Sequence, residues 1–185
     1  MQIYDIDWVV SQFRAKNKLK YLYFWGHTPR ADGQVSNACF SQWYDSPFVV
    51  DDVRYPTAEH YMMAQKALLF GDKAMFEAII SPKNRHPKKA KELGRKVANF
   101  DEKVWNAQRF DIVVNGNVAK FSQHEDLKTF LLNTGNRVLV EASPFDKIWG
   151  VGLAKDDEKI ANPLNWNGLN LLGFALMVVR DKLNS

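Results

Sequence analysis

Residues 57–70 read TAEHYMMAQKALLF, and this stretch decides the fold. Thr57 supplies the hydroxyl expected at a helix N-cap, and Gly71 follows where a helix would end. The segment therefore predicts a helix. Glu59 falls in its first turn, where the helix dipole favours a carboxylate. An acid at that position commonly serves only the helix end, so position alone gives Glu59 no chemical role.

Two further features favour a functional interpretation of this helix. Glu59 and Lys66 share one face about two turns apart, with two methionines between them, which suits a pocket wall better than a solvent-facing surface. Upstream, Ser36 and Asn37 precede an aromatic-rich run, residues 40–44, that can stack on a planar ring.

Around this helix the sequence predicts a single compact, mainly helical domain of the α+β class with a few short strands. An N-terminal helical extension, residues 1–18, precedes the main body, residues 19–185. The glycine-punctuated stretch 148–153 fits a strand or a loop. Further helices are predicted over 5–16, 87–96, 102–123, 126–132 and 171–183, and strands over 19–25, 48–53 and 137–142.

Composition excludes several classes of protein. Twelve Phe, six Trp and six Tyr among 185 residues are too many large apolar groups for a disordered chain. One cysteine, Cys39, excludes an internal disulfide and a four-cysteine zinc site. Asp5 and Asp7 lie where an export signal needs basic residues, and the longest apolar run is too short to span a membrane. We expect a soluble, cytoplasmic protein that has no membrane partner.

The net charge of +4 is concentrated in one segment. Residues 83–96 hold seven basic residues against the single acid Glu92. Such a segment is commonly a solvated helix face, but phosphate oxygens also select Lys and Arg. Lys91 and Arg95 are four residues apart and share a face of the predicted helix.

A second dense stretch is DKIWGVG, residues 146–152. Its glycines would let backbone amides approach a ligand closely, and Trp149 offers a flat face. A packed turn explains a lone Trp-Gly pair equally well. Downstream, Asn170 resembles a helix start with its polar side chain aimed outward.

These stretches together resemble the NADAR family, which includes bacterial N-glycosidases acting on riboflavin-pathway intermediates and ADP-ribosyl-guanine hydrolases. The resemblance runs in order from about Tyr23 to Leu183. The matching residues are Phe24-Trp25, Ser36-Asn37, Tyr55 to Tyr61, Ala64 to Lys66, Ala90-Lys91, Leu93 to Arg95, Trp105, Arg109, Lys120-Phe121, Leu131-Leu132, Thr134-Gly135, Val140 to Ser143, Asp146, Trp149 to Gly152, Asn170 to Gly173, Leu176-Met177 and Arg180.

The resemblance implies an enzyme that hydrolyses a ribose C1′–N bond without a cofactor or metal. The implied substrates are ADP-ribosylated guanine, with nucleic acid as a possible carrier, and phosphorylated ribosylamino-pyrimidines. Glu59 is the expected catalytic carboxylate and Asp146 a second acid, unless Asp146 only caps its loop. The expected substrate-binding residues are Lys66, Lys91 and Arg95 for phosphate, Trp149 and Gly150 for the ring or ribose, and Ser36, Asn37 and Asn170 for sugar or base edges.

Three other functions fit parts of the sequence. A non-catalytic module that binds ADP-ribose or another nucleotide could use the same residues, with Glu59 merely capping its helix. A sequence-independent nucleic-acid binder could use residues 83–96. A zinc hydrolase is disfavoured because the four histidines and Cys39 show no close ligand spacing.

Overall fold

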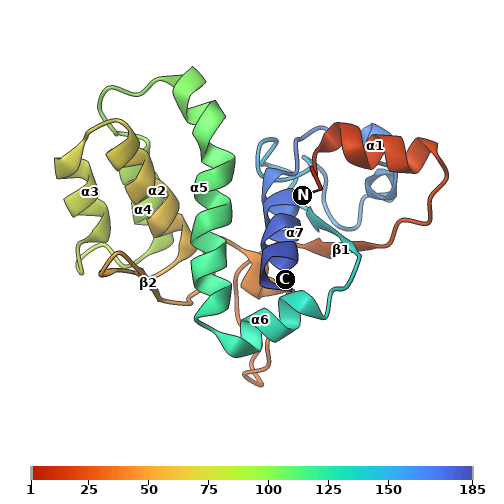
Figure 1. Ribbon diagram of the computed structural model, residues 1–185, viewed down its shortest axis with the longest axis horizontal. Coiled ribbons are helices and arrows are strands. Elements are labelled where there is room, and N and C mark those ends of the chain that lie inside the picture. The colour runs from red at the N-terminus through yellow and green to blue at the C-terminus, as the bar shows by residue number, and fades with distance from the viewer. Residues whose placement is uncertain (1, 185) are drawn as a thin grey trace. The chain divides into compact units, whose positions relative to one another are not determined.

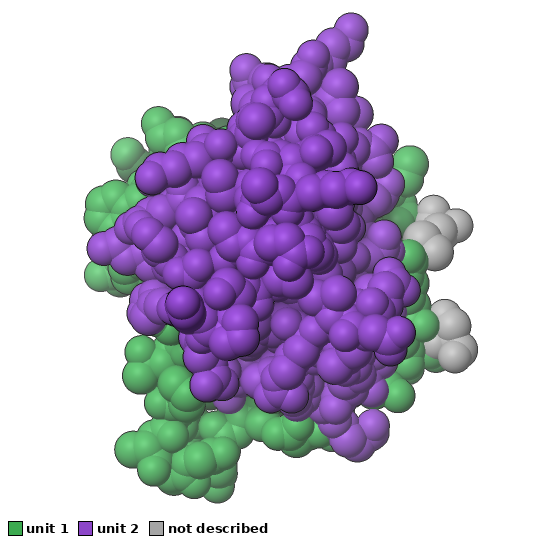
Figure 2. All heavy atoms as spheres, turned by 90° about the vertical axis from the view of Figure 1, so that its left-hand side faces the viewer, with its two compact units in different colours: residues 1–41, 126–185 green, residues 42–125 purple. Residues whose placement is uncertain are grey.

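The computed structural model describes residues 2–184 and divides into two compact units. One unit comprises residues 42–125, and the other comprises the chain up to residue 41 together with the chain from residue 126 (Figure 2). The described residues form seven α-helices and four short strands, which confirms the predicted mainly helical α+β class. Within residues 2–184, no helix is both long enough and apolar enough to cross a bilayer.

The 42–125 unit is a helical assembly built around α2 (Figure 1). Helix α2 contacts α3, α4 and α5, and residues 58–64 are buried on every face because these neighbours surround them. The sequence left α3 unassigned. Asp72 caps it by accepting a hydrogen bond from the Met75 amide at 3.0 Å. The elements are β2 (Phe48–Val50), β3 (Val53–Tyr55), α2 (Ala58–Leu69), α3 (Lys73–Ile80), α4 (Pro87–Gly94) and α5 (Glu102–Ser122).

The segment predicted as one strand, residues 48–53, is part of a β-hairpin instead. Asp51 and Asp52 have φ of 49° and 61°, the left-handed conformation of a tight hairpin turn, so the chain reverses there and β3 pairs antiparallel with β2. The side chain of Gln123, just after α5, bonds both the amide and the carbonyl of Val49, at 2.9 and 2.8 Å. This amide side chain takes the place of a further strand along β2.

The other unit is organised by a parallel pair of strands. In that pair Tyr21 lies opposite Val138 and Phe24 opposite Glu141, so both strands end at the same edge. The stretch 148–153 is a loop. The elements are α1 (Ile6–Arg14), β1 (Tyr21–Phe24), α6 (Glu125–Leu132, all but its first residue), β4 (Val138–Glu141), α7 (Leu171–Leu183) and the 3-10 helices η1 (Asn37–Phe40), η2 (Glu158–Ala161) and η3 (Pro163–Asn165).

Helix α7 packs directly against β4, and its residues 172–180 are buried. Gly173 makes this approach possible, because a Cβ at that position would collide with the carbonyl oxygen of Leu139. Helix α1 packs on η3, so the predicted N-terminal extension is part of this unit's contacts.

Candidate functional site

Glu59 is a buried carboxylate in the first turn of α2, with 3% of its surface exposed. The helix end has a separate cap: the Thr57 hydroxyl accepts a hydrogen bond from the His60 amide at 3.4 Å. The Glu59 amide donates to the Gln42 carbonyl at 2.9 Å. The Thr57 hydroxyl therefore makes the N-cap, as predicted, and the Glu59 side chain is not the cap. A chemical role for Glu59 stays a prediction.

His60 is fully buried beside Glu59 and holds the start of α2 in place. Its Nε2 lies 2.8 Å from the Asn84 carbonyl oxygen, which can only accept, so Nε2 carries the proton. Nδ1 then accepts from the Thr57 hydroxyl at 2.8 Å. Burial lowers the pKa of His60, so the ring is kept neutral. Both ring nitrogens are engaged in structural hydrogen bonds.

Buried polar side chains of α5 lie near the segment that bonds Glu59. Asn117 donates to the Gln42 side-chain oxygen at 2.8 Å, while the Gln42 carbonyl accepts the Glu59 amide. One turn further along α5, Lys120 is fully buried, and its ammonium lies 5.6 Å from the centre of the Tyr44 ring. No role was predicted for Gln42, Asn117 or Lys120. Asn117 and Lys120 share one face of the long helix with Val113, but a shared face alone does not show that a lysine is buried.

Lys66 and Arg95 lie at the carboxyl end of α4, and the ammonium of Lys91 lies 5.9 Å from the centre of the Trp43 ring. Lys66 donates to the Gly94 carbonyl at 2.9 Å and lies 4.1 Å from the centre of the Phe100 ring. Burial lowers the pKa of Lys66. Lys91 lies on the last turn of α4, and Arg95 follows as its C-cap. Cations are stabilised at this end of a helix, so part of the clustering has a structural cause.

The remaining basic residues of segment 83–96 face solvent. Lys83, Arg85, Lys88, Lys89 and Lys96 are all exposed, as is Arg95. A single ion pair is described inside the segment, between Lys89 and Glu92 at 3.7 Å. The segment therefore presents several cations on the surface of the 42–125 unit.

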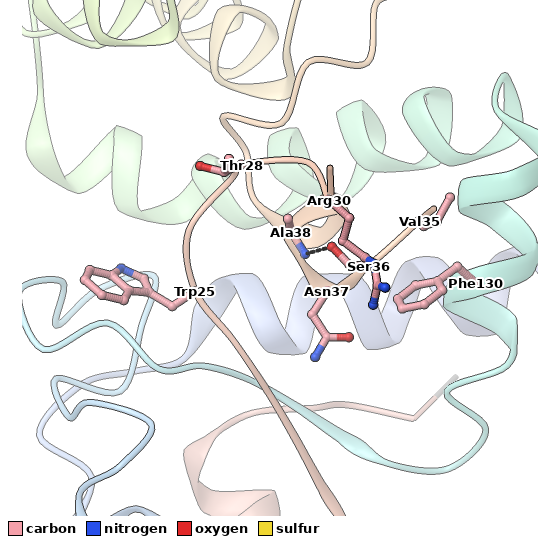
Figure 3. Close-up of a pocket in the computed structure, with 8 residues that line it drawn as sticks. All are labelled: Trp25, Thr28, Arg30, Val35, Ser36, Asn37, Ala38 and Phe130. Atoms are coloured by element: carbon pink, nitrogen blue, oxygen red, sulfur yellow. Dashed lines mark hydrogen bonds between the residues drawn. The ribbon is translucent and has the colours of Figure 1, made fainter. Parts of the chain in front are cut away.

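Ser36 and Asn37 line a pocket of about 500 Å³ in the other unit (Figure 3). Asn37 donates from Nδ2 to the Tyr23 carbonyl at 3.2 Å, which ties η1 to β1. Ser36 accepts from the Ala38 amide at 3.4 Å as the cap of η1. The pocket is lined by Trp25, Thr28, Arg30, Val35, Ser36, Asn37, Ala38 and Phe130.

Asp146 organises the turn that follows β4. Its Oδ1 accepts from the amides of Ile148 and Trp149, at 2.9 and 2.8 Å, and its own amide donates to the Ser143 hydroxyl at 3.2 Å. Asp146 therefore caps its loop, which is one of the two roles expected for it. These bonds do not test a role toward substrate, which stays a prediction.

Trp149 and Gly150 continue the turn. Trp149 is half-buried, and its carbonyl accepts from the Leu172 amide at 3.1 Å, which joins the loop to α7. A Cβ on Gly150 would lie 2.9 Å from the Glu141 carbonyl oxygen, tighter than real contacts allow. Gly150 is thus required for the close return of the loop to the end of β4.

Asn170 is the residue whose orientation differs most from the sequence expectation. The prediction that its side chain points outward is wrong: Asn170 is fully buried. Its Nδ2 donates to the Leu139 carbonyl at 2.9 Å, and its Oδ1 accepts from the Glu141 amide at 3.0 Å. Its φ of 51° turns the chain into α7 and brings the amide group back to β4. Asn170 therefore joins α7 to β4, and contact with a substrate stays a prediction.

Each unit thus carries part of the predicted set. The 42–125 unit holds Glu59, Lys66, Lys91 and Arg95, and the other holds Ser36, Asn37, Asp146, Trp149, Gly150 and Asn170. Among residues 2–184, no three His, Cys, Asp or Glu side chains are grouped so that they could hold a metal ion.

Comparison with known proteins identifies relatives of this chain. The family model described as NADAR domain matches residues 23–184. The chain is 44% identical to N-glycosidase R617 of Acanthamoeba polyphaga mimivirus over 88% of this chain and 96% of that one. It is 33% identical to N-glycosidase YbiA of Escherichia coli K12, over 82% and 81% of the two chains. The NMR structure of Escherichia coli YbiA superposes with a TM-score of 0.70 at 29% identity, covering 89% and 85%.

The match covers both units and nearly the whole chain, and several relatives share one activity name. This chain is therefore an enzyme of the N-glycosidase class. The chain belongs to the NADAR domain family.

Proposed function

We propose that the protein hydrolyses the C1′–N bond of a phosphorylated N-riboside. The substrate is ADP-ribose attached to guanine in nucleic acid, a ribosylamino-pyrimidine phosphate, or both. Each presents a ribose C1′–N bond, at least one phosphate and a planar heterocycle. The observation that carries the proposal is the Glu59 carboxylate, buried at a helix start that Thr57 already caps.

Glu59 acts on the ribose carbon in this proposal. As the C1′–N bond breaks, its electron pair leaves with the nitrogen and positive charge develops on the ribose ring. A carboxylate beneath C1′ stabilises that charge and takes a proton from the attacking water, whose oxygen forms the new bond to C1′. The leaving nitrogen gains a proton, so the products are the free sugar and the base. Burial strengthens this electrostatic effect, because a nearby charge is less screened away from water.

Phosphate recognition falls to the cations at the carboxyl end of α4. Lys91 and Arg95 lie one turn apart, and Arg95 can bind phosphate oxygens in a bidentate manner. Lys66 lies against the same helix end through its bond to Gly94. The positions of Lys66 and Arg95 at this helix end support an anion-binding role, and Lys91 lies one turn before Arg95.

Ring and sugar recognition falls to residues of the other unit. Trp149 stacks on the heterocycle or ribose, and the Gly150 backbone approaches it. Ser36 and Asn37 bond sugar or base edges, and Asp146 orients the water or a ribose hydroxyl. Asn170 supports this unit from behind, through its bonds to β4. The role of Ser36 and Asn37 in binding the sugar or base is supported by the pocket that these two residues line.

Nucleic acid is the proposed carrier of the modified guanine. The exposed cations of segment 83–96 support this, because they offer the phosphate backbone a surface with only one described internal ion pair. If they bind the strand, the KM for an oligonucleotide substrate rises steeply with salt, while the KM for the small pyrimidine substrate changes little.

The test is a paired hydrolysis assay. One substrate is an oligonucleotide carrying ADP-ribosyl-guanine and the other a ribosylamino-pyrimidine phosphate, each incubated with the wild-type protein and with Glu59→Gln. We expect Glu59→Gln to reduce the rate by about 10²- to 10⁴-fold, the range found for lost acid–base groups. Glu77→Gln, at an exposed position of α3, is the matched control and keeps the wild-type rate.

The results with the two substrates distinguish the two proposed substrate classes. Release of ADP-ribose from the oligonucleotide identifies a nucleic-acid de-modifying enzyme, and turnover of the pyrimidine alone identifies a metabolite N-glycosidase. A Glu59→Gln protein that melts like wild type and retains its rate would contradict the role given to Glu59.

A further inference from the structure

Two aromatic side chains project into solvent at the carboxyl ends of the parallel strands. Phe145 is 85% exposed and Trp25 is 59% exposed. Their ring centroids lie 6.4 Å apart at an interplanar angle of 48°, so the rings contact each other while most of their surface faces water. Exposing adjacent large rings forgoes the stabilisation of burial, and exposed apolar patches commonly mark binding sites.

Both rings are held by ordered backbone. Trp25 directly follows β1, and the carbonyl of the preceding Phe24 accepts from the Ala142 amide at 2.9 Å. Phe145 lies within the turn that Asp146 closes with its hydrogen bonds to Ser143, Ile148 and Trp149. The two rings are therefore held in their exposed positions by hydrogen-bonded backbone, at a turn for Phe145 and at a strand end for Trp25.

Trp25 also lines the pocket that contains Ser36 and Asn37. In Figure 3 Trp25 stands at one end of this pocket, and Arg30 and Phe130 stand at the other. In open α/β sheets ligands bind beyond the carboxyl ends of the strands. The parallel pair β1 and β4 also ends together at one edge, and Trp25 directly follows β1 there. A stacking surface thus adjoins a pocket that offers hydroxyl, amide and guanidinium groups.

We propose that Trp25 and Phe145 form a stacking subsite for a second planar ring of the substrate, beyond the heterocycle released from C1′. Because the two rings are tilted, they cannot sandwich a base between them; the base stacks on the open face of one ring and meets the edge of the other. The ligand chemistry is a nucleobase, supplied either by the adenine of an ADP-ribosyl group or by a neighbouring base of the strand. This inference rests on the proposed function. It narrows the proposed substrate to one that carries a second planar base besides the heterocycle released from C1′.

The first test measures binding, which requires no turnover. ADP-ribose and ribose 5-phosphate are titrated calorimetrically into wild type, Phe145→Ala, Trp25→Phe and Phe145→Trp. If adenine is the second ring, Phe145→Ala raises the Kd for ADP-ribose roughly 5- to 150-fold, the range for one lost base–aromatic stack. The Kd for ribose 5-phosphate stays unchanged, and the two aromatic replacements retain binding. Leu164→Ala, at a similarly exposed apolar position of η3, is the control.

A second experiment tests whether the second ring is a neighbouring base of the nucleic-acid strand. In that case ADP-ribose binding is unaffected, and Phe145→Ala raises the KM for a modified guanine inside an oligonucleotide but not for the isolated modified nucleoside. Equal weakening of ADP-ribose and ribose 5-phosphate, or wild-type behaviour of Phe145→Ala with every probe, would overturn the subsite.

The outcomes also separate this inference from the proposed function. Ring-dependent binding of ADP-ribose without hydrolysis of any N-riboside would remove the proposed function and leave the subsite. Hydrolysis that depends on Glu59 but not on Phe145 would support the proposed function and remove the stacking subsite.

Discussion

The two acids predicted to act on the substrate are held in opposite ways. Glu59 is buried in a helix whose cap is made by Thr57. Asp146 lies on a surface turn, and its Oδ1 accepts from two amides of that turn. Side chains that bond backbone groups occur in both units: Asn37 and Asn170 do so in one, and Gln123 does so in the other.

The contrast separates a buried carboxylate from one held on a surface turn. A charge buried among helices is less screened by water, so a nearby group experiences the charge of Glu59 more strongly. Burial of charge is not confined to one unit, because Arg180 in the unit of β1 and β4 is buried as well. Four predictions test what individual polar groups contribute.

The largest expected difference is between amide replacements of the two acids. Glu59→Gln loses about 10²- to 10⁴-fold in kcat. Asp146→Asn keeps an oxygen that can accept from Ile148 and Trp149, so it should melt like wild type and lose only about tenfold, equivalent to one modest interaction. Single-turnover rates and melting curves check both. Equal losses of kcat for the two variants would mean that the two acids contribute equally to the reaction, which contradicts the contrast drawn here.

Lys120 tests whether the buried cations of the 42–125 unit belong to its core. Lys120→Ala leaves a cavity beside Tyr44 and Phe121 and should lower the free energy of unfolding by about 2–4 kcal/mol. Lys88→Ala, on the exposed face of α4, should change it by less than about 0.5 kcal/mol. Urea denaturation measures both values. Similar small changes in the two variants would mean that the buried stem of Lys120 contributes little.

Asn170 tests the structural role of polar groups in the other unit. Asn170→Ala deprives the Leu139 carbonyl and the Glu141 amide of buried partners, and should cost about 2–3 kcal/mol of stability. Asn170→Gly loses the same bonds but tolerates the φ of 51°, so it should be less destabilised by about 1 kcal/mol. Asn165→Ala, at an exposed position of η3, is the control. Wild-type stability of Asn170→Ala would refute the account of this junction.

The smallest effect concerns pH. Burial lowers the pKa of His60 below its ordinary value of 6.5, so the unfolded chain binds a proton at a pH where the folded protein does not. Stability is therefore fully present above pH 6.5 and decreases as pH falls below it, by at most about 1.4 kcal/mol per pH unit for one group. Chemical denaturation between pH 7 and 5 should show this decrease for wild type and a flatter profile for His60→Asn. Parallel profiles would show that His60 does not cause it.

Local signals predicted most of the helices. Helix α2 begins after Thr57 as its N-cap signal predicted, and α7 spans Leu171–Leu183 as expected. The hairpin at 48–55 was missed because Asp51 and Asp52 turn the chain in a left-handed conformation that does not require glycine. Helix α3 was also missed, although Asp72 caps it by accepting from the Met75 amide.

Candidate residues could be named from the sequence where residue type and spacing point to a chemistry. Glu59 could be singled out because a carboxylate in a first helical turn, on one face with Lys66, is visible in the spacing. The orientation of Asn170 could not be, because it depends on β4, some thirty residues earlier in the chain. Lys120 was not singled out either, since a lysine within an amphipathic helix is usually solvated.

The sequence by itself thus determined most of the helices, the Thr57 cap, the family resemblance and the types of group available for chemistry, because these can be read from residue types and local spacing. Only the tertiary structure decided that β1 and β4 pair in parallel, that Asn170 turns inward, that Lys120 is buried and that Phe145 is exposed. Each of these depends on contacts between segments far apart in the chain, and burial is a property of what covers a residue rather than of the residue itself.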